Sequence, residues 1–419
     1  MTFLVRVGFS TGAGVPEEYL RLDDPVAGLL DVGLLAPDGL TTDISTDAAG
    51  HQRVMEFSID RGSSQNAGAL VEYAAGTLTL TLRDDNGDLD PATIDEPLPG
   101  ISIQLSKVWA GEVYPLFTGT VDAWLPEHRW PDQAVVVITA SDALASVAGY
   151  NRGEIAATGA GQLSGARANL WLDAIGWPAG RRDIDTGTVT LAATTLGGNV
   201  LDGLRDTALA EVGDLWATPG GTIRFRDRYG LYLDGATLQA TFGSDTAGGE
   251  LPWVDKLDIS YDRTGQINLV RAARDVEGAT VFESSDEVSR SRYGDRGPDT
   301  FALDLDTDAQ VATWVDYVRA REATPQLRFN GITIDPRVNE DALYPLVLGL
   351  DFGDRIAVVR RPPGVAADTR EAYIRGIRHS FSAPNRWQTS WELEHAPIGS
   401  AFIVDDAVHG LLDSNVLIL

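Results

Sequence analysis

A serine flanked by glycines near the start of the chain matches a known nucleophile motif. Gly8–Gly12 reads G-x-S-x-G, the pattern in which α/β-hydrolases expose a catalytic serine on a strained turn. That turn requires a central parallel strand with helices wound around it, whereas Ser10 follows one short strand and precedes an irregular segment. Because the letters match without the context, we do not assign Ser10 a catalytic role.

Acidic and amide side chains at alternate positions after residue 83 have the oxygen ligands that calcium prefers. Asp84, Asn86 and Asp88 occupy the first, third and fifth positions of a helix-loop-helix calcium loop. The sixth position is Leu89, where the loop needs glycine, and the twelfth is Asp95, where it needs glutamate. We therefore predict no metal ligands here, and the sequence leaves open whether an ion binds near Asp84–Asp88.

The other residues with useful chemistry show no known spacing. The chain has five histidines, His51, His128, His379, His395 and His409, and they form no HExxH or other metal-ligand pattern. The run Gly159-Ala-Gly161 lacks the strand-turn-helix setting of a dinucleotide fingerprint, and no Walker-type loop is present. We expect no catalytic, cofactor-binding or metal-binding residues, and hence a protein that is not an enzyme.

Composition and charge narrow the class of protein. The 419 residues are 43% hydrophobic, which predicts packed cores and, at roughly 150 residues per domain, about two to four domains. The net charge of −28 argues against direct nucleic-acid binding, since that needs clustered basic residues. The sequence has no cysteine, no apolar run long enough for a membrane span and no signal-peptide pattern at its start. We expect a soluble protein made in the cytoplasm.

Residues 1–150 are predicted to form a β domain. After a first strand, Thr2–Phe9, a segment rich in Gly, Pro and Asp runs over residues 10–50, and its length indicates an interaction arm. Further strands are expected at Val54–Arg61, Gly76–Arg83, Ile101–Trp109, Pro115–Trp124 and Ala134–Ala140. Leu78, Leu80 and Leu82 alternate with threonines, so one face of this sheet should be buried.

Residues 151–253 are predicted to form a mixed α/β domain inserted between two β domains. Apolar residues at helical spacing indicate helices over Ser164–Ile175 and Asn199–Glu211, with Asn199 as the cap of the second. A hairpin of Asp214–Ala217 and Thr222–Arg226 follows directly.

Residues 254–395 are predicted to form a second β domain with one helix, 307–324, which begins in a capping box of Thr307 and Gln310. Strands are expected at Leu257–Tyr261, Leu269–Arg274 and Arg328–Ile334, followed by a three-stranded meander over Asp351–Glu394, whose Arg, His and Trp residues we interpret as strand surface and core. The apolar tail, 396–419, is expected to dock on a neighbouring subunit. The predicted fold class is mainly β, with two small antiparallel β-barrel domains flanking a mixed α/β domain.

Several motifs resemble minor tail proteins of long-tailed actinobacterial phages (siphoviruses). In the N-terminal domain the resemblance lies in Ser58–Gly62, Ala75–Leu82, Asn86–Pro91 and Leu116–Val121. Later pieces resemble the tail-hub family related to the baseplate-hub protein of contractile phages; they are Asp214–Arg228, Ser291–Gly294, the Thr307 helix, Leu350–Arg355 and Tyr373–His379. The resemblance covers nearly the whole chain in order, and the arm at 10–50 departs from it.

The resemblance implies a structural virion protein at the tail tip. Such hubs are homotrimers whose subunits each carry two related β-barrels, so that a ring with pseudo-sixfold symmetry joins the sixfold tail tube to a threefold tip. Implied partners are the distal tail or tail-tube protein, the tape-measure protein, and other minor tail or receptor-binding (host attachment) proteins. We expect deletion of Ala396–Leu419 to leave a folded protein that fails to assemble.

Three other functions stay open from the sequence. A distal tail protein forms a six-copy ring with one barrel, and the second β domain argues against it. A tail-tip cell-wall hydrolase would cut glycan or peptide and would need a carboxylate or Ser10. A carbohydrate-binding module would use exposed tryptophans such as Trp124, Trp130 and Trp253.

Overall fold

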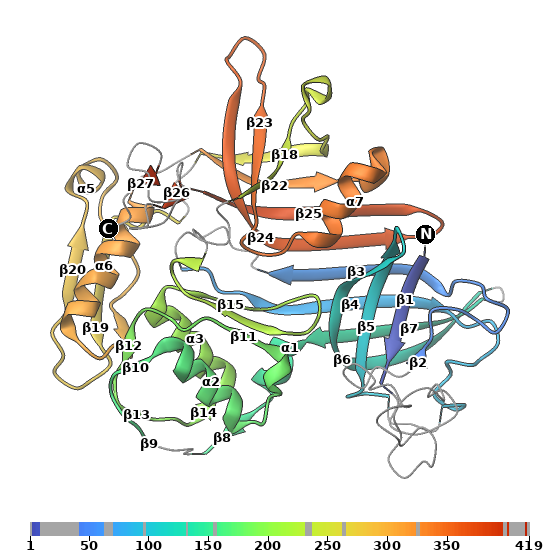
Figure 1. Cartoon of the computed structure of the whole chain (residues 1–419), viewed down its shortest axis with the longest axis horizontal. Helices are drawn as coiled ribbons and strands as arrows, with labels where there is room; N and C mark the ends of the chain where they lie inside the picture. The colour runs from blue at the N-terminus through green and yellow to red at the C-terminus, as the bar shows by residue number, and fades with distance from the viewer. Residues whose placement is uncertain are drawn as a thin grey trace.

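One large, mostly antiparallel sheet dominates the molecule (Figure 1). The computed structural model describes residues 2–8, 42–62, 70–94, 98–130, 133–153, 157–230, 237–261, 265–323, 327–396, 400–401 and 415–416. Along the sheet the strands follow the order β18 (Val254–Ser260), β22 (Arg328–Ile334), β25 (Arg386–His395), β24 (Asp368–Ser382), β3 (Val54–Gly62), β4 (Ala74–Arg83), β7 (Gln133–Asp142), β6 (Glu112–Arg129), β5 (Ser102–Trp109), β1 (Thr2–Val7) and β2 (Thr42–Asp43). β23 (Arg355–Arg360) also pairs with β24, and β17 (Leu238–Phe242) pairs with β23 in parallel.

The N-terminal strands form where alternation predicts them. Leu78, Leu80 and Leu82 of β4 are buried at 1% exposure or less, while Thr77 and Thr79 on the other face are exposed. Antiparallel ladders link β4 to β3 and β7, β7 to β6, β6 to β5, and β5 to β1. All five strands predicted between residues 54 and 140 are confirmed, and β6 runs longer at both ends than predicted.

The predicted meander also forms, and it joins the N-terminal strands directly. Antiparallel pairing sets Gly376–Ser382 of β24 beside Glu56–Gly62 of β3. The mainly β fold class is therefore confirmed, but the strands of both predicted barrels lie in one sheet. The strand pairings of the described residues close no ring, because β18 and β2 end the sheet on opposite sides.

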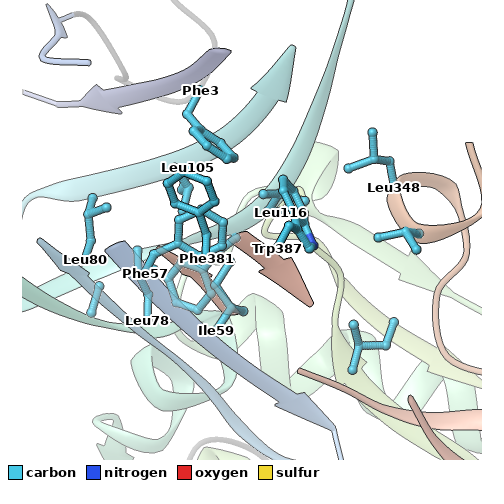
Figure 2. Packing of buried hydrophobic residues seen from close by; sticks show 14 of the residues in the cluster. Phe3, Phe57, Ile59, Leu78, Leu80, Leu105, Leu116, Leu348, Phe381 and Trp387 are labelled. Carbon is cyan, nitrogen blue, oxygen red and sulfur yellow. The ribbon is translucent and has the colours of Figure 1, made fainter. Parts of the chain in front are cut away.

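The main core contains side chains from both ends of the chain (Figure 2). Phe3 on β1 lies 4.7 Å from Phe381 on β24 and 5.5 Å from Trp387 on β25, measured between ring centroids. Phe57 on β3 contacts the same two rings at 5.4 and 5.7 Å. Since aromatic pairs add stability beyond their buried area, this cluster binds the two parts of the sheet together.

A smaller α/β region lies beside the sheet (Figure 1). Its helices are α1 (Ala143–Ala148), α2 (Ser164–Ala174) and α3 (Val200–Glu211), and its three-stranded sheet contains β11 (Arg182–Ile184), β16 (Ile223–Arg226) and β15 (Asp214–Ala217). Two-residue strands complete it: β8 (Asn151–Arg152), β9 (Ala157–Thr158), β10 (Gln162–Leu163), β12 (Thr190–Leu191), β13 (Thr194–Thr195) and β14 (Gly198–Asn199). Both predicted helices are confirmed, and the Asn199 side chain accepts hydrogen bonds from the backbone N–H groups of Leu201 and Asp202.

Residues 265–323 pack against this α/β region. They form β19 (Leu269–Arg274), β20 (Phe282–Ser285), α5 (Glu287–Tyr293), β21 (Phe301–Leu303) and α6 (Asp308–Glu322). Buried Val311, Trp314 and Val318 of α6 share a core with Leu191 and Ala210. The capping box of Thr307 and Gln310 is present as predicted. The predicted domain boundaries stay a prediction. The contacts between residues 265–323 and the α/β region cross the boundary predicted at residue 253.

Three helices lie where the sequence did not predict them. α7 (Glu340–Gly349) contains Pro345 in its interior, and α5 includes part of the Ser291–Gly294 motif. α1 directly follows β7 and is capped by Asp142. Short 3-10 turns are present at Ala179–Arg181, Thr246–Gly248 and Pro336–Val338. No helix in the described ranges is long and apolar enough to cross a membrane.

The two segments predicted to interact with partners fall largely outside the described residues. Of the arm at 10–50, only residues 42–50 are described, and Ile44 and Ser45 in them are buried. Of the tail at 396–419, the structure describes buried Ala396 and two short strands, β26 (Ser400–Ala401) and β27 (Asn415–Val416), which pair in parallel.

Candidate functional site

Oppositely charged side chains are buried together where the two parts of the large sheet join. Arg375 on β24 is 3% exposed, and its Nη1 donates to Asp214 Oδ2 and to the Tyr73 hydroxyl, both at 2.7 Å. Its Nε donates to Glu394 on β25. Arg321 of α6 donates to the other carboxylate oxygen of Glu394 at 2.8 Å. We call these five residues the central junction.

The central junction balances two guanidinium groups against two carboxylates. Burial alone lowers the pKa of Arg375, but Asp214 and Glu394 hold it well above its usual value. Burial alone raises the pKa of Glu394, but Arg375 and Arg321 hold it below its usual value. Burial also raises the pKa of Tyr73, so its hydroxyl keeps its proton. Each buried charge thus depends on its partners, because removal of one partner leaves another buried charge uncompensated.

The central junction connects elements that lie far apart in the sequence. Tyr73 precedes β4, Asp214 opens β15 of the α/β region, and Arg321 lies in the last turn of α6. Arg375 and Glu394 bring in the two long C-terminal strands. Because these groups satisfy one another, the arrangement suits a structural anchor that fixes the α/β region on the sheet, and it leaves no carboxylate poised for acid-base work.

A second buried arginine reinforces the central junction. Arg61 on β3 is 4% exposed, and its Nη2 donates to the Ala217 carbonyl oxygen at 2.7 Å and to Asp351 Oδ1 at 3.1 Å. Its guanidinium lies 4.8 Å from the ring centroid of Phe352, which in turn stacks on Tyr73 at 5.2 Å. The β15 hairpin and the turn before β23 are therefore both held against β3.

This arrangement of sheet and α/β region is found in solved tail proteins. The tail protein from Neisseria meningitidis MC58 matches with a TM-score of 0.57 and 14% identity, over 94% of this chain and 97% of that chain. The 43 kDa tail protein of prophage MuSo2 from Shewanella oneidensis matches with a TM-score of 0.50 and 14% identity, over 82% of this chain and 93% of that one. The fold is that of phage tail proteins. No protein-family model and no curated protein sequence matches the chain.

An arginine lies between the acidic side chains of the Asp84–Asp88 segment. Arg53 Nη1 donates to Asp84 Oδ1 at 3.2 Å, and Arg53 Nη2 donates to Asp88 Oδ2 at 2.5 Å. Asp84 Oδ1 also accepts from the Leu89 backbone N–H at 3.1 Å. A guanidinium group thus lies where a cation would bind, and the described residues contain no cluster of three or more acidic or His side chains that could hold a metal.

We expect calcium to leave the stability of the protein unchanged, because the Arg53 guanidinium already pairs with both Asp84 and Asp88. Thermal unfolding in excess chelator and in millimolar calcium should give the same Tm. A bound ion would raise Tm with calcium concentration by mass action, and such a rise would contradict this prediction.

The other residues considered from the sequence do not come together. Residues 9–12 of the G-x-S-x-G match, and His409, lie outside the described residues. Gly159–Gly161 form the turn between β9 and β10. Exposed His51 pairs with Asp47, and His128, also exposed, lies near the end of β6. Among the tryptophans proposed as a carbohydrate platform, Trp124 is buried and donates to the Leu89 carbonyl oxygen, while Trp130 is 94% exposed.

His379 lies in the core beside the aromatic cluster. Its Nδ1 is 2.8 Å from Thr389 Oγ1, and its ring centroid is 5.9 Å from that of Trp387. Burial, together with the charge of Arg61, lowers the pKa of His379 to about 3. The imidazole is therefore neutral in the folded protein at pH values where it would be charged in the unfolded chain.

We expect acidification below about pH 6.5, the ordinary pKa of histidine, to destabilise the fold through His379, because the unfolded chain then binds a proton that the folded chain rejects. The loss of stability should continue as the pH falls towards about 3, the pKa of His379 in the folded protein. Between pH 7 and pH 5 the free energy of unfolding should fall by about 2 kcal/mol because of His379. His379→Asn, which keeps a partner for Thr389, should flatten the pH dependence of urea unfolding. His128→Asn, on an exposed part of β6, should retain the wild-type slope. Equal slopes for both variants would contradict the assignment.

Sequence reasoning missed the central junction, although β24 carried a signal. Ile377, His379 and Phe381 point into the core at alternate positions, and the same alternation places Arg375 on the buried face. An arginine on an apolar face indicates buried carboxylate partners. Glu394 lies on the next strand of the predicted meander. Asp214 could not be paired with Arg375 from the sequence, because it comes from the α/β region, 161 residues away.

Proposed function

We propose that this chain is a structural, non-catalytic protein of a phage tail tip, where copies of it form a ring. The proposed ring is a homotrimer that joins the sixfold tail tube to the threefold tip and its receptor-binding proteins. One observation carries the proposal: almost the whole chain shares its fold with almost the whole of a tail protein. The buried pairing of the central junction is consistent with a rigid building block.

The proposed neighbours are the distal tail or tail-tube protein and the tape-measure protein. Light scattering gives the mass of the purified protein alone and after mixing with either neighbour. A trimer in either sample supports the ring, a hexamer favours a distal tail ring, and a persistent monomer refutes a ring of this chain. A zymogram with host cell walls tests the non-catalytic role, because a clearing band would contradict it.

We expect deletion of residues 397–419 to abolish assembly without unfolding the protein. The deletion should start after Ala396, because that residue is buried and its N–H donates to the Glu371 carbonyl oxygen at 2.9 Å. Circular dichroism should show the wild-type fold and light scattering a monomer. Assembly of the truncated protein at wild-type concentrations would show that the tail is dispensable.

A further inference from the structure

An apolar pocket of about 470 Å³ opens between α3 and the segment that precedes β4. Its walls include Val71, Leu209, Val212, Leu215 and Phe301. This volume falls within the roughly 300–1,000 Å³ of pockets that bind organic groups. The size and the apolar lining suit a large aromatic side chain.

The rim of this pocket is acidic. Glu72, Asp202 and Asp206 are exposed at its edge, and Arg205 pairs with Glu72 at 3.0 Å. An adjoining pocket shares Asp202 and Asp206 and adds Asp275 and Asp304. Burial raises the pKa of Asp206, and the charges of Asp304, Asp202 and Asp275 raise it further. The rim therefore carries unbalanced negative charge and attracts a cationic partner.

The turn after β6 presents the complementary chemistry. Trp130 is 94% exposed, the highest value among the large hydrophobic side chains of the described residues. It follows His128 and Arg129, which are also exposed. Arg129 has one described ion pair, with Glu127 at 3.1 Å, and both partners of that pair are exposed. Tryptophan and arginine are both among the residue types that most often dominate the binding energy of protein interfaces.

We propose that Trp130 of one copy inserts into the pocket of a second copy, with Arg129 facing Asp202 and Asp206. The high exposure of Trp130 shows that it does not fill the pocket of its own chain. Trp130 follows a strand of the large sheet, whereas the pocket borders α3 of the α/β region, so the contact joins two different surfaces. Heterologous contacts of this kind repeat from copy to copy, and they form a ring when the rotation between copies closes. The inference rests on the proposed ring and specifies the contact that builds it.

Sedimentation equilibrium of the full-length chain tests the contact. Trp130→Ala should weaken self-association roughly tenfold or more, the effect expected of a buried interface tryptophan. Arg129→Glu and Asp206→Arg should each weaken it, and the double variant with both reversals should recover association. Val288→Ala is the matched control, because Val288 is 80% exposed on α5 and outside both surfaces. Circular dichroism confirms that each variant is folded.

A photo-reactive phenylalanine at position 130 provides a second readout. Cross-links between copies should map to residues 70–73 or to α3. If wild-type protein assembles but the variants assemble equally well, or if cross-links map elsewhere on the chain or to another tail protein, the contact is refuted and the ring stands. If wild-type protein remains a monomer alone and with its tail neighbours, the contact and the ring are both refuted.

Discussion

Replacing Arg375 with methionine is expected to lower the free energy of unfolding by about 3–5 kcal/mol, the range found when one member of a buried ion pair is removed. Methionine retains much of the side-chain length, so the effect should come from charge and not from lost packing. Asp214 and Glu394 would lose their hydrogen bonds to Arg375 while remaining buried. Arg321 would still donate to Glu394 at 2.8 Å and so compensate part of that loss.

Arg378→Met is the matched control, because Arg378 lies on the same strand but faces solvent. Its guanidinium pairs with Asp60 at 2.7 Å, and both side chains are about half exposed. Pairs of this kind contribute about 0–1 kcal/mol. Chemical denaturation of both variants measures the difference. If Arg375→Met costs no more than Arg378→Met, the central junction contributes little to stability.

Replacing Gly62 with alanine is expected to cost about 3 kcal/mol or more, from two separate causes. Gly62 has φ +105°, which an alanine adopts only with strain. A Cβ atom there would also collide with the Arg375 carbonyl oxygen and would lie 2.7 Å from Gly376 Cα. The change would push β3 away from β24 at the central junction.

Gly364→Ala separates the two causes. Gly364 has φ +76°, and no atom lies within 4 Å of its added Cβ. Its substitution should lower the free energy of unfolding only by the cost of placing alanine in a left-handed backbone conformation, about 1–2 kcal/mol. Denaturant midpoints for both variants give the comparison. Equal losses would show that β3 and β24 can separate without penalty.

Local signals predicted most of the strands. They also predicted helices α2 and α3 by their apolar faces and helix α6 by its capping box. The alternation in β4, the Asn199 cap and the capping box at Thr307 depend on neighbours a few residues away, so the sequence displays them. Helix α7 was missed because Pro345, a helix breaker in most contexts, lies inside it. Its buried Leu343, Tyr344, Val347 and Leu348 pack on the main core, so tertiary contacts stabilise it.

The joining of two predicted β domains into one sheet was not predictable from local patterns. Each set of strands reads as a complete antiparallel unit, and nothing in β3 alone identifies β24 as its neighbour. The same limit applies to the candidate site. Asp84 and Asp88 were singled out as an acidic cluster, but their partner Arg53 comes from a different strand end. Arg375 was predicted only as one of the surface and core residues of the meander, and its partner Asp214 lies in the α/β region.

The pairing of β3 with β24 also has a consequence for synthesis on the ribosome. Glu56–Gly62 of β3 emerges early, but its partner Gly376–Ser382 is translated only near the end of the chain. At about 5–20 residues per second, one edge of β3 therefore waits unpaired for tens of seconds. During that interval the nascent N-terminal strands present an open edge and the unburied ring of Phe57, which invite pairing with other chains. Yield in the host should therefore depend on chaperones that shield this edge until the last strands are made.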